Sequence, residues 1–492
     1  MDKKYFIINK EPNVNILGLD PIIRAFCSAD FEELTGVPLS EFYYELENEC
    51  FVAILEKDAL LDMSNKLFEK MVDDHNFPKL LESLLMESGT EIYKLCKQTL
   101  EELKNGSIAE EEMKLRIIEI YRLFTEMCVP NVVAPMIEMG AGGMTAKIKQ
   151  IIEGKDLDAN NFSVSDCIAI LTTPTKTIWT DEARKALHVI AQKKFEGNNI
   201  EDDLMKYVED YGWVYYGYCG PKYGMKNAKD ELIVILDNTL SPIEQWNKRE
   251  LEIERTKKRQ VDIMKALKFS DDEKYFMQTA QSFGYTKGYR ANLMALADYT
   301  NNEMLSLFAK KEGYAMKQIG VCAVREIEDY LSGKEKLPDV NILNKRLEYC
   351  LLIHKRDSSE VLLGDEALKW VDDNVEIDKM DQGVSELSGN VACAGDTKII
   401  AGTVKILLDP KEISKVESGD ILLSTNTIPE HVPAMRRSSA IVTQMGGLTC
   451  HAAIVSRELN KPCLIGVKYL LDLFVDGDQA EIDLDRGVIR KI

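Results

Sequence analysis

The residue best suited to covalent chemistry in this sequence is His451, which stands at the start of an expected helix. The stretch Ile441-Val-Thr-Gln-Met-Gly-Gly-Leu-Thr-Cys-His is typical of a buried strand followed by a sharp turn, which Gly446-Gly447 permit. Thr449 stands where the N-cap of the helix is expected, so His451 falls in the first helical turn. The unpaired backbone N–H groups there disfavour imidazolium and attract an anion. The pattern predicts a neutral, nucleophilic imidazole in a ready-made phosphate site, with Cys450 in the same turn.

An isolated histidine at a helix start is more often a partly exposed capping residue, so the elements around His451 decide the interpretation. The residues from about 399 onward have the two-residue periodicity of short strands, interrupted by two helical pieces near 430–437 and 450–459. The expected strands are Ile399–Leu408, Ile421–Ser424, Ala440–Thr443, Cys463–Val467, Gln479–Leu484 and Val488–Ile489. This alternation predicts a compact β/α domain of about one hundred residues.

This stretch resembles the swivelling phosphohistidine domain of the phosphoenolpyruvate-utilising enzymes, such as phosphoenolpyruvate synthase and pyruvate phosphate dikinase. Three more pieces match that domain in order: Gly402-Thr-Val-Lys-Ile-Leu-Leu408, Gly419-Asp-Ile-Leu-Leu-Ser-Thr-Asn-Thr-Ile-Pro429 and the closing hairpin Asp476-Gly-Asp-Gln-Ala-Glu-Ile-Asp-Leu-Asp-Arg-Gly-Val488. The resemblance covers about 389 to 492. It implies that His451 is the phosphorylated histidine, that Thr449 is the hydroxyl beside it, and that Gly446 and Gly447 form the turn.

The rest of the chain is expected to be mainly helical, so the fold class is multidomain. We expect a helical N-terminal region at 1–125, a mostly helical central domain at 126–363, and the β/β/α swivelling domain at 389–492. The expected helices include Glu110–Val129, Ile243–Leu267, Asp271–Phe283, Leu293–Lys311 and Val324–Leu331, and Ile233–Leu236 is a short β-like run.

An acidic segment separates the helical part from the C-terminal domain. Between Gly364 and Asn390 there are eight acidic residues against two lysines, with Gly383 and Gly389 near the end. Such a solvated, self-repelling stretch predicts a hinge linker at 364–388, and the alternative is an ordered connector docked on the helical domain.

Two parts of the family's usual architecture are not recognised in the sequence. Phosphoenolpyruvate-using members carry a TIM barrel after the swivelling domain, whereas the sequence ends at Ile492. ATP-using members carry an ATP-grasp domain, but the glycine cluster Gly140-Ala-Gly-Gly143 lacks the GK[ST] of a P-loop and is expected to be a loop between helices. The resemblance therefore implies that ATP and Mg²⁺ bind a separate ATP-grasp partner, with no cofactor bound tightly to this chain.

The middle of the chain resembles, more weakly, the helical domain of rifamycin phosphotransferase-like proteins, and phenylphosphate synthase is a family precedent for an ATP-binding part on another subunit. The segments on which this weaker resemblance depends are Tyr211-Gly-Trp213, Gly220-Pro221, Ser241-Pro-Ile-Glu-Gln-Trp246 and Tyr285-Thr-Lys-Gly-Tyr-Arg290. An aromatic cluster there could line an acceptor pocket, although helical core is the more common role of such residues. The cluster comprises Trp213, Tyr215, Tyr216, Tyr218 and Tyr223, with Lys222 among them. Lys287 and Arg290 could steer a phosphorylated ligand, with surface ion pairing as the alternative.

The composition excludes several other classes of function. A net charge of −21 disfavours a nucleic-acid partner. No apolar run approaches the ~20 residues that span a bilayer, and the start does not resemble a secretory signal. The eleven cysteines form no CxxC pair and there are only five histidines, so we expect no metal site and a reducing, cytoplasmic location.

Together these observations lead to one hypothesis and one alternative. The hypothesis is a phosphotransferase subunit: His451 takes a phosphoryl group from ATP on the partner, the domain swings on its linker, and a small organic acceptor at the helical domain receives the group. The alternative is a phosphocarrier or regulatory protein that relays phosphate without a metabolic substrate of its own.

Overall fold

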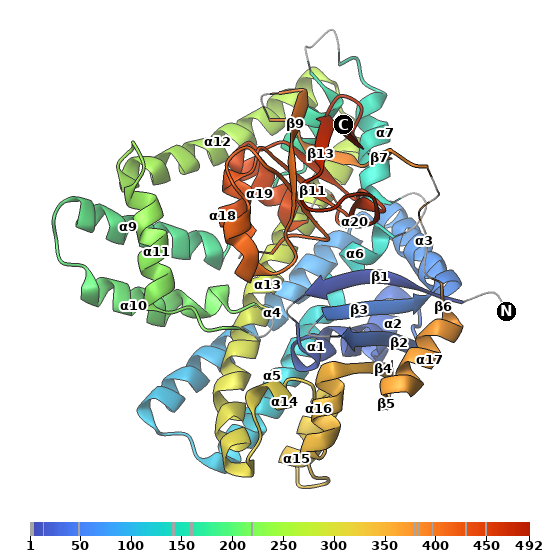
Figure 1. Cartoon of the computed structure of the whole chain (residues 1–492), viewed down its shortest axis with the longest axis vertical. Coiled ribbons are helices and arrows are strands. Elements are labelled where there is room, and N and C mark those ends of the chain that lie inside the picture. The colour runs from blue at the N-terminus through green and yellow to red at the C-terminus, as the bar shows by residue number, and fades with distance from the viewer. Residues whose placement is uncertain are drawn as a thin grey trace.

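The computed structural model describes residues 4–12, 14–47, 50–139, 143–157, 162–217, 220–376, 380, 383–395, 397–428, 431–447 and 450–492. Figure 1 shows two sheets joined by a large helical region, with the N-terminal strands in blue below and the C-terminal strands in red above. No helix in these described ranges is long and apolar enough to cross a membrane.

The N-terminal sheet combines the beginning of the chain with residues more than three hundred positions later. Its strands are β1 (Tyr5–Pro12), β2 (Glu41–Glu47), β3 (Cys50–Glu56), β4 (Tyr349–Lys355), β5 (Ser359–Leu363) and β6 (Val375–Glu376). They lie in the order β5-β4-β2-β3-β1-β6, antiparallel except for the β1–β6 pair. The prediction that 1–125 is helical is therefore wrong for these strands, and the boundary at 126 falls inside a helix.

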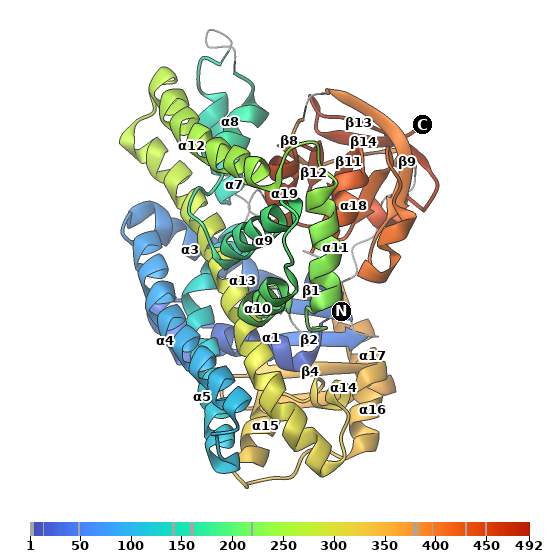
Figure 2. The same ribbon diagram turned by 90° about the vertical axis from the view of Figure 1, so that its left-hand side faces the viewer.

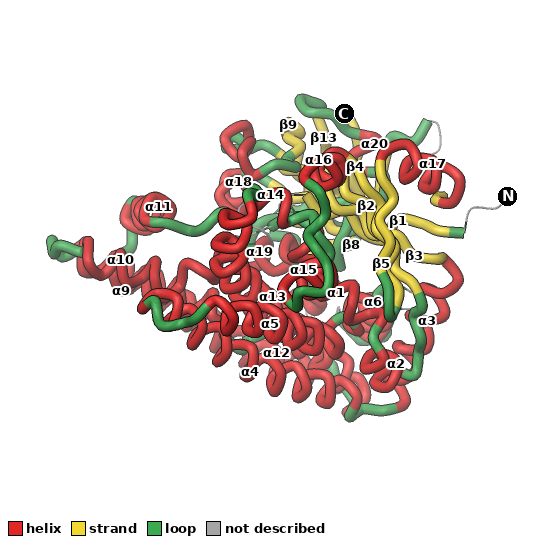
Figure 3. Tube along the Cα trace, turned by 90° about the horizontal axis from the view of Figure 1, so that it is seen from below, coloured by secondary structure: helices red, strands yellow, loops and turns green. Residues whose placement is uncertain are grey.

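The helical region fills the middle of the molecule. Its helices are α1 (Ile16–Cys27), α2 (Ala29–Thr35), α3 (Lys57–Asp73), α4 (Phe77–Asn105), α5 (Glu110–Asn131), α6 (Val133–Ile137), α7 (Met144–Glu153), α8 (Val164–Leu171), α9 (Trp179–Phe195), α10 (Glu201–Tyr211), α11 (Met225–Leu236), α12 (Pro242–Ala266), α13 (Asp271–Glu312), α14 (Met316–Ile319), α15 (Val324–Leu331) and α16 (Val340–Glu348), with the short 3₁₀ helix η2 (Gly212–Tyr215). Figure 3 shows α4, α5 and α12 on the side of the molecule away from the strands.

The longest helix, α13, organises this region. It runs for 42 residues and joins the two helices expected at 271–283 and 293–311. It packs closely on α4 because Gly89 has no side chain: a Cβ there would lie 2.7 Å from Leu293 Cδ1. The expected β-like run Ile233–Leu236 is the end of α11, because its apolar residues continue a helical pattern rather than pair with a strand.

The acidic segment is not a hinge over its first half. Residues Gly364–Asn374 form the helix α17, and β6 after it pairs with β1. Ala367 is fully buried and Trp370 stacks on Tyr43 of β2 with 4.7 Å between ring centroids, so this helix covers one face of the N-terminal sheet. The acidic residues at 365, 366, 372 and 373 belong to this amphipathic helix. The connection between β6 and the next strand is limited to residues 377–385, of which 380 and 383–385 are described.

The C-terminal domain follows its prediction closely. Its strands are β7 (Glu386–Ser388), β8 (Asn390–Cys393), β9 (Ile399–Ile406), β10 (Ile421–Ser424), β11 (Ala440–Thr443), β12 (Cys463–Ile465), β13 (Gln479–Asp483) and β14 (Val488–Lys491). They form one sheet in the order β7-β14-β13-β9-β10-β11-β12-β8, in which β9 to β12 are parallel. The helices are α18 (Val432–Arg437), α19 (His451–Leu459) and α20 (Leu470–Leu473), with the 3₁₀ helix η3 (Pro410–Lys415).

The C-terminal domain is docked on the helical region. Its edge strand β8 lies against α8, and the two views in Figures 1 and 2 place the domain above α13 beside α7 and α8. One hydrophobic core continues across the junction, from Ile148 and Leu171 of the helical region to Ala392 and Ala453 of the C-terminal domain. The face of the domain that contains β8 and α19 is thus the face that meets the helices.

Candidate functional site: the His451 turn

His451 lies where a buried strand turns into a helix. The four residues of β11 are all fully buried, and α19 begins at His451 itself. The helix is capped by Cys450, whose Sγ accepts a hydrogen bond from Ala453 N–H at 3.4 Å. Thr449 was expected at this cap, and it lies outside the described residues. The first helical turn therefore includes His451, as predicted, but the N-cap is the next residue along.

Gly446 shapes the turn that leads into this helix. Its φ of +120° lies in the region that favours glycine, and a Cβ there would meet Cys450 Sγ at 2.8 Å. Cys450 N–H closes the turn by donating to the Gly447 carbonyl at 2.9 Å. A Cβ on Gly447 would make only an ordinary contact, so the turn requires glycine at the first of the two positions.

The His451 ring is held by a residue from another strand end. Thr427 Oγ1 and His451 Nδ1 share a hydrogen bond of 2.8 Å, and Thr427 is only 5% exposed. Thr427 follows β10, the parallel neighbour of β11, so its position comes from the sheet rather than from the helix. The sequence marked Thr427 as part of a matching run but gave no reason to place it on the histidine.

Two other basic side chains of the domain have structural positions. Arg457 donates Nε–H to the Ala392 carbonyl of β8 at 3.0 Å, and burial lowers the pKa of its guanidinium. His431 is fully buried and neither ring nitrogen has a partner among the described residues. Burial lowers the pKa of His431 to about 4, so this ring is neutral in the folded domain.

The His451 turn faces the helical region. A Cβ on Gly447 would lie 3.9 Å from Thr145 Oγ1, in the first turn of α7. Thr145 N–H donates to Glu138 Oε2 at 3.2 Å, and Glu138 is the C-cap that follows the last residue of α6. Gly143 caps α7 and lies between helices, as expected for the glycine cluster, whose residues 140–142 are outside the described ranges.

Comparison with known proteins decides what this domain is. Residues 416–487 match the family described as PEP-utilising enzyme, mobile domain. The C-terminal domain is a mobile domain of the phosphoenolpyruvate-utilising enzymes. A probable phosphoenolpyruvate synthase of Archaeoglobus fulgidus is 46% identical over 114 residues, which are 23% of this chain and 15% of that protein.

Other relatives match the same mobile domain. The phosphoenolpyruvate synthase of Pyrococcus furiosus is 50% identical over 91 residues, or 18% of this chain and 11% of its own length. That of Escherichia coli is 40% identical over 90 residues, again 18% and 11%. Aconitase X of Thermococcus kodakaraensis aligns with 22% of this chain and 99% of its own, at 14% identity and a TM-score of 0.18, too low to compare folds. The chain thus spans a small part of these relatives, and the shared part is the mobile domain.

The aromatic cluster of the helical region is packed within the core of that region. Trp213 is 3% exposed within the main core, and its indole donates to the Asp210 carbonyl at 2.8 Å. Tyr215 and Tyr207 share a phenol–phenol hydrogen bond of 3.1 Å, while Tyr216 accepts one from Asn302. These side chains are core, which is the alternative that the sequence left open.

The remaining residues of that cluster and the two suggested cations have ordinary structural surroundings. Tyr223 is buried in the core of α9 to α11, and Tyr218 lies outside the described residues. Lys222 pairs with Glu303. Lys287 is exposed on α13, and Arg290 lies close enough to Cys128 of α5 to affect the thiol, whose pKa burial raises to about 12.

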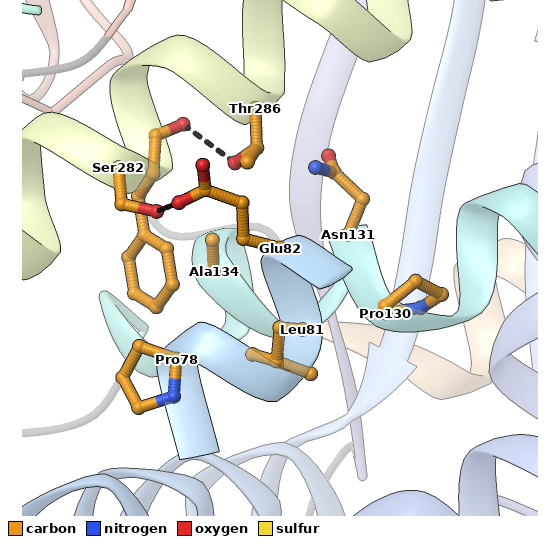
Figure 4. Close-up of a pocket in the computed structure, with 9 residues that line it drawn as sticks. Pro78, Leu81, Glu82, Pro130, Asn131, Ala134, Ser282 and Thr286 are labelled. Atoms are coloured by element: carbon orange, nitrogen blue, oxygen red, sulfur yellow. Dashed lines mark hydrogen bonds between the residues drawn. The ribbon is translucent and has the colours of Figure 1, made fainter. Parts of the chain in front are cut away.

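A small pocket of about 210 Å³, including its mouth, lies between α4, α5, α6 and α13. Its polar lining includes Glu82, Asn131 and Thr286, and Figure 4 shows Ser282 and Glu82 pointing toward each other, joined by a hydrogen bond of 2.6 Å. Ala134 of α6 also lines it, one turn before Glu138. Among the described residues, no three His, Cys, Asp or Glu side chains come together in a group that could hold a metal ion.

Proposed function

We propose that this chain is a phosphotransferase subunit in which His451 carries a phosphoryl group from a nucleotide to a small organic acceptor bound by the helical region. The observation that carries the proposal is the position of His451 at the first residue of α19, with Nδ1 held by Thr427 at 2.8 Å. The phosphoenolpyruvate synthases that share the mobile domain support the same class of reaction.

In this proposal Nδ1 of His451 carries the ring proton and donates to Thr427 Oγ1. In the neutral imidazole one nitrogen carries the proton and the other keeps a lone pair. When Nδ1–H donates to Thr427 Oγ1, the lone pair is on Nε2, which is then the atom that attacks phosphorus. Backbone N–H groups at the start of α19 would stabilise the charge of the bound phosphoryl group.

The donor in this proposal is ATP, bound with Mg²⁺ by a separate ATP-grasp protein. The mobile-domain match is confined to residues 416–487, and the described part of residues 1–376 forms a helical region and a mainly antiparallel sheet. This chain would then contribute the carrier and the acceptor site, while the partner contributes the nucleotide.

A carrier of this kind must reach two sites. In the structure the His451 turn lies against α7, so delivery to an acceptor at the helical region fits the docked arrangement. Phosphorylation by a partner would require the mobile domain to leave that position. The segment 377–385 is the connection that would permit this movement.

The test is phosphorylation by the expected partner. The full chain is incubated with a candidate ATP-grasp protein, Mg²⁺ and ATP labelled at both the β and γ phosphates, so that either phosphoryl group is detected. We expect an adduct that is stable in base and labile in acid, and we expect His451→Ala to remove it. His75→Ala, at an exposed histidine that stacks on Tyr275, is the matched control and should label normally. Labelling that persists in His451→Ala would overturn the assignment.

A further inference from the structure

Gly447 of the His451 turn lies beside Thr145, in the first turn of α7. Thr145 bridges the two parts, because its Oγ1 lies 3.9 Å from a Cβ placed on Gly447 and its N–H donates to Glu138 Oε2 at 3.2 Å. In space, Thr145 thus lies between Gly447 of the His451 turn and the Glu138 carboxylate. The two segments are about three hundred positions apart in the sequence, so only the docking of the domain brings them together.

Glu138 is held firmly in this corner. Gly143 packs against it so closely that a Cβ at 143 would lie 3.1 Å from Glu138 Oε2 and 3.0 Å from its Cα. Glu138 is half-buried and makes no ion pair with a Lys, Arg or His among the described residues. A carboxylate in such a place differs from the many surface carboxylates of this chain that pair with lysine or arginine.

We propose that Glu138 is the general base that accepts the hydroxyl proton of the phosphoryl acceptor, which binds beside Thr145 and Gly447, where the helical region meets the C-terminal domain. This inference rests on the proposed function, because it names the base for delivery from His451. The acceptor class is a small alcohol or phenol, since the carboxylate has a proton to remove only from a hydroxyl group.

The step balances without any further reactant. The acceptor oxygen forms a bond to phosphorus while the bond between phosphorus and His451 Nε2 breaks, and that electron pair returns to Nε2. The hydroxyl proton moves to the Glu138 carboxylate, and the ring leaves as neutral imidazole with Nδ1–H still on Thr427. Burial raises the pKa of Glu138, and the hydrogen bonds from Thr145 oppose that effect. A carboxylate with a raised pKa is a stronger base than an exposed one.

A purely structural role for Glu138 makes a different prediction. The carboxylate could serve only to accept the Thr145 N–H at the start of α7, where Gly143 provides no side-chain cap. A glutamine amide oxygen accepts the same hydrogen bond but is not basic. Glu138→Gln therefore preserves the structural role and removes the proposed chemical one.

The experiment separates delivery from phosphorylation. The full chain is phosphorylated with potassium phosphoramidate, a small chemical donor that needs no partner, and the adduct on His451 is measured by mass spectrometry. Discharge is then followed between pH 6 and 9 in water and in molar ethanediol, the probe acceptor, with inorganic phosphate and ethanediol phosphate measured by ³¹P NMR. Glu153→Gln, which makes the same charge change at the exposed far end of α7, is the matched control.

We expect Glu138→Gln to form the adduct as fast as the unchanged chain but to discharge it at least about tenfold more slowly, the low end of a general-base contribution. The rate at which the unchanged chain loses the phosphoryl group from His451 should increase as the pH rises and Glu138 loses its proton. This rising limb of the pH profile should be absent in Glu138→Gln. Glu138→Asp should restore part of the rate.

Other outcomes have distinct meanings. Equal discharge rates and pH profiles in Glu138→Gln and the unchanged chain would overturn the assignment of the base while leaving His451 as carrier. A pH profile of the unchanged chain without the rising limb would overturn it even if the variant does not fold. Failure of His451 to form any adduct would instead reject the proposed function itself.

Discussion

Replacing Thr427 with valine should slow phosphorylation of His451 without abolishing it. Valine has nearly the shape of threonine but lacks the hydroxyl, so Thr427→Val removes the 2.8 Å hydrogen bond to Nδ1 and little else. Thr427 is 5% exposed, so water has little room to replace the missing group. The ring then loses the hydrogen bond that fixes its orientation and, in the proposed mechanism, the acceptor for the Nδ1 proton.

The size of the effect follows from the strength of one buried hydrogen bond. A net contribution of about 0.5 to 1.5 kcal/mol corresponds to a rate change of roughly two- to twelvefold, because 1.36 kcal/mol is about tenfold in rate. We expect a value toward the upper end, since a neutral imidazole must also present the correct nitrogen. The loss of stability should stay within about 1.5 kcal/mol.

The assay is the rate of adduct formation with potassium phosphoramidate at pH 7, measured at His451 by mass spectrometry. Thr425→Val is the matched control, because Thr425 lies two residues earlier and contributes its backbone carbonyl to Met445 N–H. Unfolding in urea establishes that both variants are folded. Equal rates for Thr427→Val and the unchanged chain would refute the role given to Thr427, and an equal slowing in Thr425→Val would show that the loop rather than the hydrogen bond is responsible.

Three further predictions concern the mobile domain. Gly446→Ala should lower the free energy of unfolding by about 1 to 3 kcal/mol, because of the φ of +120° at this position and the clash of a Cβ with the Cys450 cap. In the same phosphoramidate assay, Gly446→Ala should abolish labelling of His451, whereas Gly447→Ala should label normally. In the double variant Thr145→Cys, Gly447→Cys, a disulfide between the two introduced cysteines should hold the domain docked, so that oxidation blocks phosphorylation by a partner and reduction restores it. The single Gly447→Cys variant is the control. Undiminished phosphorylation of the oxidised double variant would show that the domain need not move. Burial lowers the pKa of His431 to about 4 in the folded domain, whereas in the unfolded chain the ring has its ordinary pKa of about 6.5. Between pH 7 and pH 5 the unfolded chain therefore binds a proton that the folded domain does not, and the free energy of unfolding falls by roughly 2 kcal/mol. His431→Leu should lack this part of the acid destabilisation in urea unfolding, and an identical pH dependence in both proteins would contradict it.

The C-terminal domain could be predicted from the sequence because its signals are local. Strands β10 and β11 are short apolar runs bounded by polar residues, and their observed ends are the predicted ones. The helix after the turn was also placed correctly, but its cap was misplaced by one residue. Threonine is a strong capping residue in general and cysteine is not, so the sequence preference pointed to Thr449 rather than Cys450.

The N-terminal sheet could not be predicted in the same way, because its pairings join distant parts of the chain. Strand β2 is buried on both faces, with Tyr43 under α17 and Tyr44 in the main core, so it lacks the polar alternation of a half-exposed strand. The strand that pairs with it, β4, comes from residues beyond 348. The hinge prediction for residues 364–374 depended on their acidic charge. The three-residue spacing of Ala367 and Trp370, which both pack on this sheet, is instead typical of an amphipathic helix.

The candidate site shows the same division. His451 and its turn were predictable from neighbouring residues, whereas the two contacts that give them chemical meaning depend on tertiary structure. Thr427 reaches the ring because parallel strands β10 and β11 end side by side, and Thr145 reaches Gly447 because the domains are docked. Neither the Thr427–His451 hydrogen bond nor the proximity of Thr145 to Gly447 could be predicted from the spacing of residues along the chain.

The length of the connection limits where a donor can meet His451. Strand β6 ends at Glu376 and β7 begins at Glu386, so nine residues, 377–385, join two elements that are each paired into a sheet. Even fully extended, nine residues reach only about 30 Å. If both sheets stay intact, the start of the mobile domain must remain within that distance of β6, and the domain reaches other sites mainly by rotating about this point. We therefore expect a partner that supplies the phosphoryl group to bind close to this tether, beside the N-terminal sheet and α17. This constraint predicts that a donor protein, once identified, protects α17 from exchange or proteolysis.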